Sequence, residues 1–475
     1  MGRKAIGIPV LGALGGAAFW LSDAHRRDRF ERTARVWRLT VRRGTHWLVV
    51  KARGVRATEE ERARLEEQFA IRSAEDVARE LGNMKGAIMK AGQMLSFIAD
   101  GLPPEAQAAL ATLQADVPPM APSLAAQVVR EELGAEPERL FLDWDPVPVA
   151  AASIGQVHRA VMRDGRIVAV KVQYPGVDRA IRADLDNAEL LYGLFSAMAL
   201  RNLDVHALVD ELRMRMGDEL DYLKEAAAQS QMAAIYEGHP FISVPRVVPE
   251  RSARRVLTSE WADGLRWEDF LEEADEATRQ RAAEVVFRFS QGSVHAHGIF
   301  NGDPHPGNYR FHLDGRVTFL DFGLVKRWEP GEWELLSPVL DRLLAEDRAG
   351  TVAAMVAAGF LPADHGLDPD AVWGYVSGPY QPYLTDSFTF SRAWTASVLS
   401  QLLDVNGPYT EVLRRLNLPP SFVILDRVVW GTSAILGRMA ASNRWRAILA
   451  EYREGAPPAT ALGREEAGWR AAHGA

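Results

Sequence analysis

The sequence predicts an α+β fold in which a small strand-rich lobe is followed by a larger helical lobe. Two short apolar stretches, Val157–Met162 and Ile167–Val172, flank an Arg-Asp-Gly-Arg turn, which is the pattern of a β-hairpin. From residue 266 onward, apolar residues recur mainly at helical spacing, apart from one further hairpin with an Asp-Gly turn at residues 314–315. These observations predict a bilobal chain, and helical patterns before the first strands predict an N-terminal helical extension.

The order of these elements divides the chain into four expected segments. Helices are expected over residues 73–100, 104–115, 123–133, 178–200 and 205–237, and short strands over 244–248 and 255–260. The four segments are a basic N-terminal region with a candidate membrane-associating stretch (1–72), a helical extension (73–136), a strand-rich N-lobe (137–262) and a helical C-lobe (263–475).

Composition excludes several classes of protein. The chain has 475 residues and no cysteine, so disulfides, thiolate metal sites and cysteine nucleophiles are absent. Its 47% apolar and 25% charged residues are typical of a globular protein. The formal net charge of -8 makes general nucleic-acid binding unexpected.

The N-terminal region differs in charge from the rest of the chain. Residues 1–56 hold 13 Lys or Arg against three Asp or Glu, a local charge of +10, which favours an anionic partner such as a membrane surface. Residues 5–22 carry no charge but are barely long enough to span a bilayer and contain Pro9. We expect a cytoplasmic protein that is peripheral to, or weakly anchored in, the inner membrane; the alternative is a helix lying on the protein itself.

A lysine in the second strand of the first hairpin needs a partner. Val168, Val170 and Val172 share one face of this strand, and Lys171 lies on the other. A lysine in so apolar a strand requires a nearby carboxylate, because an unpaired charge is costly to bury.

The following helix offers three acidic residues as that partner. Glu219 and Asp221 are two positions apart and therefore lie about 200° apart on a helix, so both cannot serve one cation side by side. We take Glu225 as the first choice for the partner of Lys171 and Glu219 as the second.

Two acidic loops, residues 303–308 and 321–323, contain residue types that are typical of a catalytic site. Asp303 and Asn308 are five positions apart in a loop rich in Pro and Gly, and Asp321-Phe-Gly follows a predicted strand. An Asp-x4-Asn loop, a hairpin and Asp-Phe-Gly form the base-and-metal arrangement of kinases. The Asn308 amide and the Asp321 carboxylate offer the oxygen ligands that Mg²⁺ prefers, and Asp303 can orient or deprotonate an attacking hydroxyl or water.

The predicted nucleotide-covering loop departs from that of protein kinases. In place of Gly-x-Gly-x-x-Gly, the chain has an alanine-rich run in which only one glycine remains, so ordinary protein-kinase activity is disfavoured. Adenine contacts are expected from the backbone near Glu260 and Ala262. The expected phosphate-covering residues are Ala151, Ala152, Ser153 and Gly155.

In combination, these motifs resemble the ABC1/AarF/UbiB (coenzyme-Q-eight, ADCK-like) family of atypical kinases, over residues 70–340 and more weakly to 440. One departure is Asn301-Gly302, where the family more often has His-Ala. The matching motifs are Lys90-Ala-Gly-Gln93, the run 150–153, the lysine strand 168–173, Glu219-Leu-Asp221, the loop 303–308 and Asp321-Phe-Gly323.

This resemblance implies a protein-kinase-like fold that uses ATP and Mg²⁺. It also implies that the helix carrying Lys90 and Gln93 packs across the cleft where a protein kinase receives its peptide, with both side chains directed toward Glu219, Asp221 and the phosphates. The family is linked to isoprenoid-quinone biosynthesis, usually at membranes, through an ATPase or small-molecule kinase role.

Three interpretations of the function follow. The first is an active ATPase or kinase that acts on or near a lipid or quinone-type molecule, favoured by intact Lys171, Asp303, Asn308 and Asp321. The second is a nucleotide-binding regulatory scaffold without phosphotransfer, favoured by the alanine-rich run and the covering helix. An antibiotic-type phosphotransferase is disfavoured by the Lys-x-Gly-Gln and Asp-Phe-Gly motifs together. The substrate and the oligomeric state are not specified by the sequence.

Overall fold

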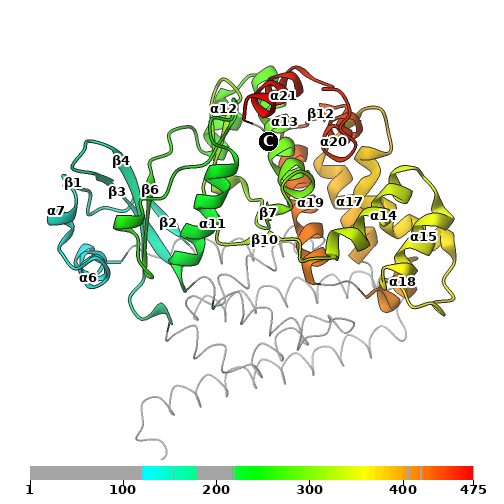
Figure 1. The fold of residues 1–475 in the computed structure, drawn as a ribbon, viewed down its shortest axis with the longest axis horizontal. Helices are drawn as coiled ribbons and strands as arrows, with labels where there is room; N and C mark the ends of the chain where they lie inside the picture. The colour runs from blue at the N-terminus through cyan, green and yellow to red at the C-terminus, as the bar shows by residue number, and fades with distance from the viewer. Residues whose placement is uncertain are drawn as a thin grey trace, which may run out of the picture. The chain divides into compact units, whose positions relative to one another are not determined.

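The fold is taken from a computed structural model (Figure 1), which describes residues 120–152, 154–178, 217, 220–403, 407–417 and 420–473. All described residues belong to one compact unit. The predicted helices over 73–100 and 104–115, most of 178–200 and the basic region 1–72 lie outside the described residues.

A five-stranded antiparallel sheet holds the predicted lysine strand. The strand order is β1-β3-β4-β6, and β2 also pairs with β3. The β3–β4 pairing runs from Val161 opposite Ile167 to Gly155 opposite Gln173, which confirms the first predicted hairpin. The strands are β1 (Asp143–Trp144), β2 (Ala150–Ala152), β3 (Gly155–Val161), β4 (Ile167–Gln173) and β6 (Val256–Glu260).

One face of this sheet packs against helix α6 (Pro122–Leu133), next to the short helix α7 (Pro137–Leu140). The three valines of β4 are fully buried in a shared core with α6 residues Val128 and Val129. This burial confirms the predicted alternation of β4: the valines face the core, and Lys171 lies on the opposite face of the strand. The predicted end of α6 is also confirmed, since Gly134 adopts the left-handed conformation, with φ of 80°.

Helix α11 (Tyr222–Ile235) corrects one prediction about the acidic residues. We predicted a helix over 205–237 that includes Asp221. In the structure, Asp221 is the N-cap of α11, with extended backbone angles, and its carboxylate accepts a hydrogen bond from the Leu223 N–H at 3.1 Å. The helical 200° separation therefore does not apply to Asp221, because a capping aspartate stabilises a helix start instead of continuing the helix.

Two smaller sheets surround the predicted catalytic loops. Strands β8 (Tyr309–Phe311) and β9 (Val317–Phe319) confirm the second hairpin, and β5 (Ile242–Ser243) pairs in parallel with β9. The strand predicted over 244–248 is thus shifted, since only Val247 there forms an isolated bridge. Strand β7 (Ile299–Asn301) pairs with β10 (Val325–Arg327).

The remainder of the described chain is mostly helical, as predicted, and the α+β class is confirmed. Helix α13 (Glu276–His295) is buried over most of its length and packs on α19 (Pro420–Arg438) and α20 (Trp445–Arg453). No helix in the described ranges has both the length and the apolar character needed to cross a membrane. The other elements are η1 (Pro249–Arg251), α12 (Trp267–Glu273), η2 (Pro306–Asn308), α14 (Glu332–Leu344), α15 (Arg348–Ala357), α16 (Pro369–Ser377), η3 (Gly378–Tyr383), β11 (Phe388–Thr389), α17 (Arg392–Leu403), α18 (Thr410–Arg415), β12 (Ser442–Asn443) and α21 (Ala461–His473).

Candidate nucleotide and metal site

Lys171 on β4 forms a nearly buried ion pair with Glu225 on α11. The Lys171 Nζ lies 2.9 Å from both carboxylate oxygens of Glu225, and the two side chains are 15% and 8% exposed. Burial disfavours the ammonium, but the carboxylates of Glu225 and Asp321 together raise the pKa of Lys171 well above its ordinary value. The structure thus contains the pair that the sequence favoured, formed between the sheet and α11.

Asp321 lies beside this pair. Its Oδ2 is 3.8 Å from the Lys171 Nζ, and its Oδ1 accepts a hydrogen bond from the Gly323 N–H at 3.0 Å. A Cβ on Gly323 would lie 3.3 Å from Asp321 Oδ1 and 3.9 Å from a Glu225 oxygen, so glycine leaves room for both carboxylates. Phe322, which lies between Asp321 and Gly323 in the sequence, is buried and anchors the turn in the core.

Asn308, the second predicted metal ligand, is tied to the residue before Asp321. The Leu320 N–H donates to the Asn308 carbonyl at 2.9 Å, and the Asn308 N–H donates to the His305 carbonyl at 2.9 Å. The donor set fits Mg²⁺ in chemistry, because an amide and a carboxylate both present hard oxygen atoms. Within the described ranges no cluster of three or more His, Cys, Asp or Glu could hold a metal ion, so Mg²⁺ here would need phosphate or water oxygens to complete its coordination.

Asn301, which sequence reasoning did not single out for a role, joins the two acidic loops. Its Oδ1 accepts from the Asp303 N–H at 2.9 Å, and its Nδ2 donates to the Asp321 carbonyl at 2.6 Å. Its side chain is buried at the end of β7. The only signal in the sequence was the replacement of the usual His-Ala by Asn301-Gly302.

Asp303 itself forms an ion pair with Arg427 of helix α19. The Asp303 and Arg427 side chains are 19% and 15% exposed, and the two residues are 124 positions apart. Sequence analysis missed Arg427, because a single arginine on a long helix carries no local sign of the loop it contacts.

The first part of the alanine-rich run forms strand β2. Ala151 and Ala152 belong to this strand and pair with Gln156 and Gly155 of β3. A Cβ on Gly155 would lie 2.2 Å from the Val172 carbonyl oxygen. The close backbone approach at this glycine is therefore made with the neighbouring strand.

The predicted adenine-contacting segment lies at the end of β6. Glu260 is the last residue of β6; its N–H donates to the Arg246 carbonyl at 2.9 Å, and its carboxylate accepts from the Arg246 N–H at 3.1 Å. Ala262 lies two residues further on. Four predicted site residues lie outside the described residues: Lys90, Gln93, Ser153 and Glu219.

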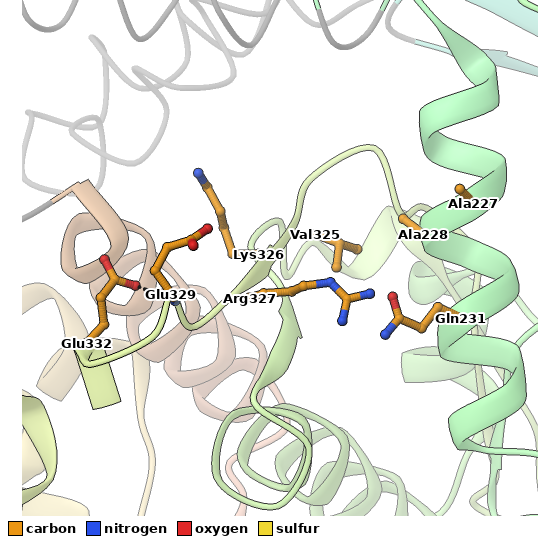
Figure 2. Close-up of a pocket in the computed structure, with 8 residues that line it drawn as sticks. All are labelled: Ala227, Ala228, Gln231, Val325, Lys326, Arg327, Glu329 and Glu332. Atoms are coloured by element: carbon orange, nitrogen blue, oxygen red, sulfur yellow. Dashed lines mark hydrogen bonds between the residues drawn. The ribbon is translucent and has the colours of Figure 1, made fainter. Parts of the chain in front are cut away.

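A cavity of about 530 Å³ lies between α11 and β10, next to the segment that follows Asp321 (Figure 2). In Figure 2, Arg327 extends from β10 toward Gln231 on α11. None of the predicted site residues lines this cavity, although α11 also carries Glu225. The lining residues are Ala227, Ala228, Gln231, Val325, Lys326, Arg327, Glu329 and Glu332.

The Lys171–Glu225 pair leads to a testable expectation. We expect Lys171→Met and Glu225→Gln each to weaken Mg-ATP binding, and the double variant to be little worse than either single variant, because each change removes the same contact. Binding affinities for the four proteins form a double-mutant cycle. Additive losses would mean that Glu225 is not the functional partner of Lys171.

Comparison with known proteins assigns the family. The ABC1 atypical kinase-like domain matches residues 112–355. An uncharacterised aarF domain-containing protein kinase of Arabidopsis thaliana is 32% identical over 310 residues, covering 65% of this chain and 44% of the relative. ACTIVITY OF BC1 COMPLEX KINASE 1 of the same plant is 31% identical over 312 residues, covering 63% and 45%. Both are described as chloroplastic, and this chain spans less than half the length of either.

A solved structure agrees with this assignment over most of the chain. It is the complex of Rv3197 with erythromycin, from Mycobacterium tuberculosis. It is 30% identical in sequence, has a TM-score of 0.60, and the match covers 83% of this chain and 98% of the other. On its motifs, its mixed helices and strands and these matches, the chain belongs to the ABC1 atypical kinase-like (ABC1/AarF/UbiB) family.

Proposed function

We propose that the chain is an atypical kinase or ATPase that uses ATP and Mg²⁺ and supports isoprenoid-quinone or other membrane-lipid metabolism. The main support for this proposal is that Lys171 lies within hydrogen-bond distance of Glu225 and within ion-pair distance of Asp321, although the three residues come from separate segments. A buried lysine beside two carboxylates is suited to binding Mg-ATP. The ammonium would attract the phosphates, and the Asp321 carboxylate would attract Mg²⁺.

In this proposal each part of the site has a separate task. Lys171 binds the nucleotide phosphates and Glu225 holds it in place. Asp303 orients the attacking water or hydroxyl, and Asn308 and Asp321 hold Mg²⁺, which would neutralise charge on the phosphates. The residues that would cover the phosphates or contact adenine are Ala151, Ala152, Ser153, Gly155, Glu260 and Ala262.

The proposal also includes the two-lobed arrangement and the helical extension. Residues 137–262 and 263–475 would form the two lobes, with ATP between them. Residues 73–136 would place Lys90 and Gln93 over the cleft, near Glu219. A cleft covered in this way excludes a peptide, so a small molecule or water is the expected phosphoryl acceptor.

Phosphate release from Mg-ATP by the full chain tests this proposal. We expect release that rises when anionic lipid vesicles or a quinone-like phenol is added, and that is lost in Lys171→Met. Binding of Mg-ATP without release under all of these conditions would instead support the regulatory scaffold. Efficient phosphorylation of generic protein substrates would contradict the covered cleft.

The basic region 1–56 is proposed to bring the chain to a membrane surface. We expect the full chain to sediment with anionic liposomes and a chain starting at residue 57 to remain in solution. Each Lys or Arg near an anionic surface contributes on the order of 1 kcal/mol, and salt should weaken the binding steeply. Added DNA serves as a competitor for the same charges. Equal sedimentation of both chains would show that the basic region is not the membrane determinant.

A macrolide is a second candidate ligand. The relative from Mycobacterium tuberculosis was solved with erythromycin, and the match covers 98% of that chain. Thermal unfolding with erythromycin, alone and together with Mg-ATP, tests this candidate. An unchanged melting temperature at saturating nucleotide and millimolar macrolide would remove it.

A further inference from the structure

Asp303, the expected catalytic aspartate, is held by a cation from outside its own loop. The Asp303 carboxylate and the Arg427 guanidinium are in direct contact, and both side chains are largely buried. A carboxylate in such a place needs a compensating charge, because its desolvation is otherwise unfavourable. The neighbouring sequence offers none, since residues 299–308 contain no Lys or Arg.

The Arg427 guanidinium supplies the positive charge that contacts the Asp303 carboxylate.

Helix α19 is packed against the loop at a second point, which places Arg427 accurately. A Cβ on Gly302 would lie 2.8 Å from Ile424 Cγ2, so the helix and the loop are in close contact one residue before Asp303. Ile424 and Arg427 are three positions apart and share one face of α19. The Gly302 N–H donates to the Leu324 carbonyl at 2.7 Å, which also ties the loop to the segment after Asp321.

We propose that Arg427, on helix α19 of the same chain, is a positioning residue for the catalytic Asp303. This inference rests on the proposed function. In that reaction the attacking oxygen bonds to the γ-phosphorus of ATP, the bond to the bridging oxygen of ADP breaks, and the attacking oxygen passes its proton to the Asp303 carboxylate. Arg427 contacts Oδ1 of that carboxylate through Nη2 and so fixes the orientation of the carboxylate toward the attacking oxygen.

Steady-state phosphate release by the full chain tests the role of Arg427. We expect Arg427→Ala to lower kcat by about 10- to 100-fold, at or below the lower end of the range for losing the general base itself because Arg427 acts only through Asp303, with the KM for Mg-ATP changed less than about threefold. Arg427→Lys should recover part of kcat. Combining Arg427→Ala with Asp303→Asn should lower kcat no further than Asp303→Asn alone, because both act on one carboxylate.

Arg438→Ala is the matched control. Arg438 lies on the same helix and pairs with Glu268 at 2.7 Å, so its loss should leave kcat within about twofold. If Arg427→Ala also stays within twofold while Asp303→Asn is inactive, the inference is wrong and the proposed function stands. A fall in kcat that Arg427→Lys does not relieve and that adds to Asp303→Asn overturns it as well. Wild-type protein that releases no phosphate under any condition overturns the proposed function together with this inference.

Discussion

Replacing Asp321 by asparagine is expected to abolish most of the stabilisation by Mg-ATP while leaving the fold intact. Its Oδ2 lies 3.8 Å from Lys171, and its side chain is 36% exposed at the proposed metal site. The amide keeps the size of the carboxylate but not its charge, and a hard divalent ion depends on that charge. Phosphate release should fall with the binding, by about 100-fold or more, since the metal would carry much of the transition-state charge.

Thermal unfolding with and without Mg-ATP measures this effect. A ligand at about 100 times its dissociation constant stabilises a protein by about 2.7 kcal/mol, which is a readily measured shift in melting temperature. Asp314→Asn is the matched control, because Asp314 lies in the turn of the neighbouring hairpin, about half exposed and paired only with Arg316. The control should keep the full shift. If Asp321→Asn also keeps it, Asp321 is not the metal ligand.

Replacing Arg288 by methionine is expected to destabilise the fold by about 3–5 kcal/mol. The Arg288 side chain is fully buried in α13 and lies 2.8–2.9 Å from carboxylate oxygens of Glu284, Glu451 and Glu466. It also donates to the Thr460 hydroxyl at 2.9 Å. Methionine has a similar shape but no charge, so three carboxylates would remain together in a poorly solvated place.

Chemical denaturation followed by circular dichroism measures this loss of stability. Arg281→Met is the matched control, because Arg281 lies on the same helix and pairs with Glu465 at 3.1 Å near the surface. An exposed pair of this kind contributes about 0–1 kcal/mol. Similar losses for both variants would mean that the buried network does not hold the C-terminal helices on α13.

Local pattern was enough to predict strands β3, β4 and β6 of the sheet and the identity of the buried pair, but not strands β1 and β2. The alternation of β4 placed Lys171 opposite the three valines, and the need to neutralise a buried ammonium then called for an acid on the next helix. Glu225 meets that need at 2.9 Å. The same reasoning failed at Asp221, because the spacing of acidic residues does not reveal where a helix starts, and a side chain that caps a helix leaves the helical pattern.

The sequence by itself determined the α+β class, both hairpins, the Lys171 strand and the two acidic loops, since each rests on residues within one turn or one strand of each other. Only the tertiary structure decided that Asn301 joins these loops, that Arg427 pairs with Asp303, and that Arg288 collects carboxylates from more than 160 positions away. The physical reason is that periodicity shows which face of an element is buried but not which element covers it. The partner of a buried charge is chosen by packing, through contacts between segments far apart in the chain.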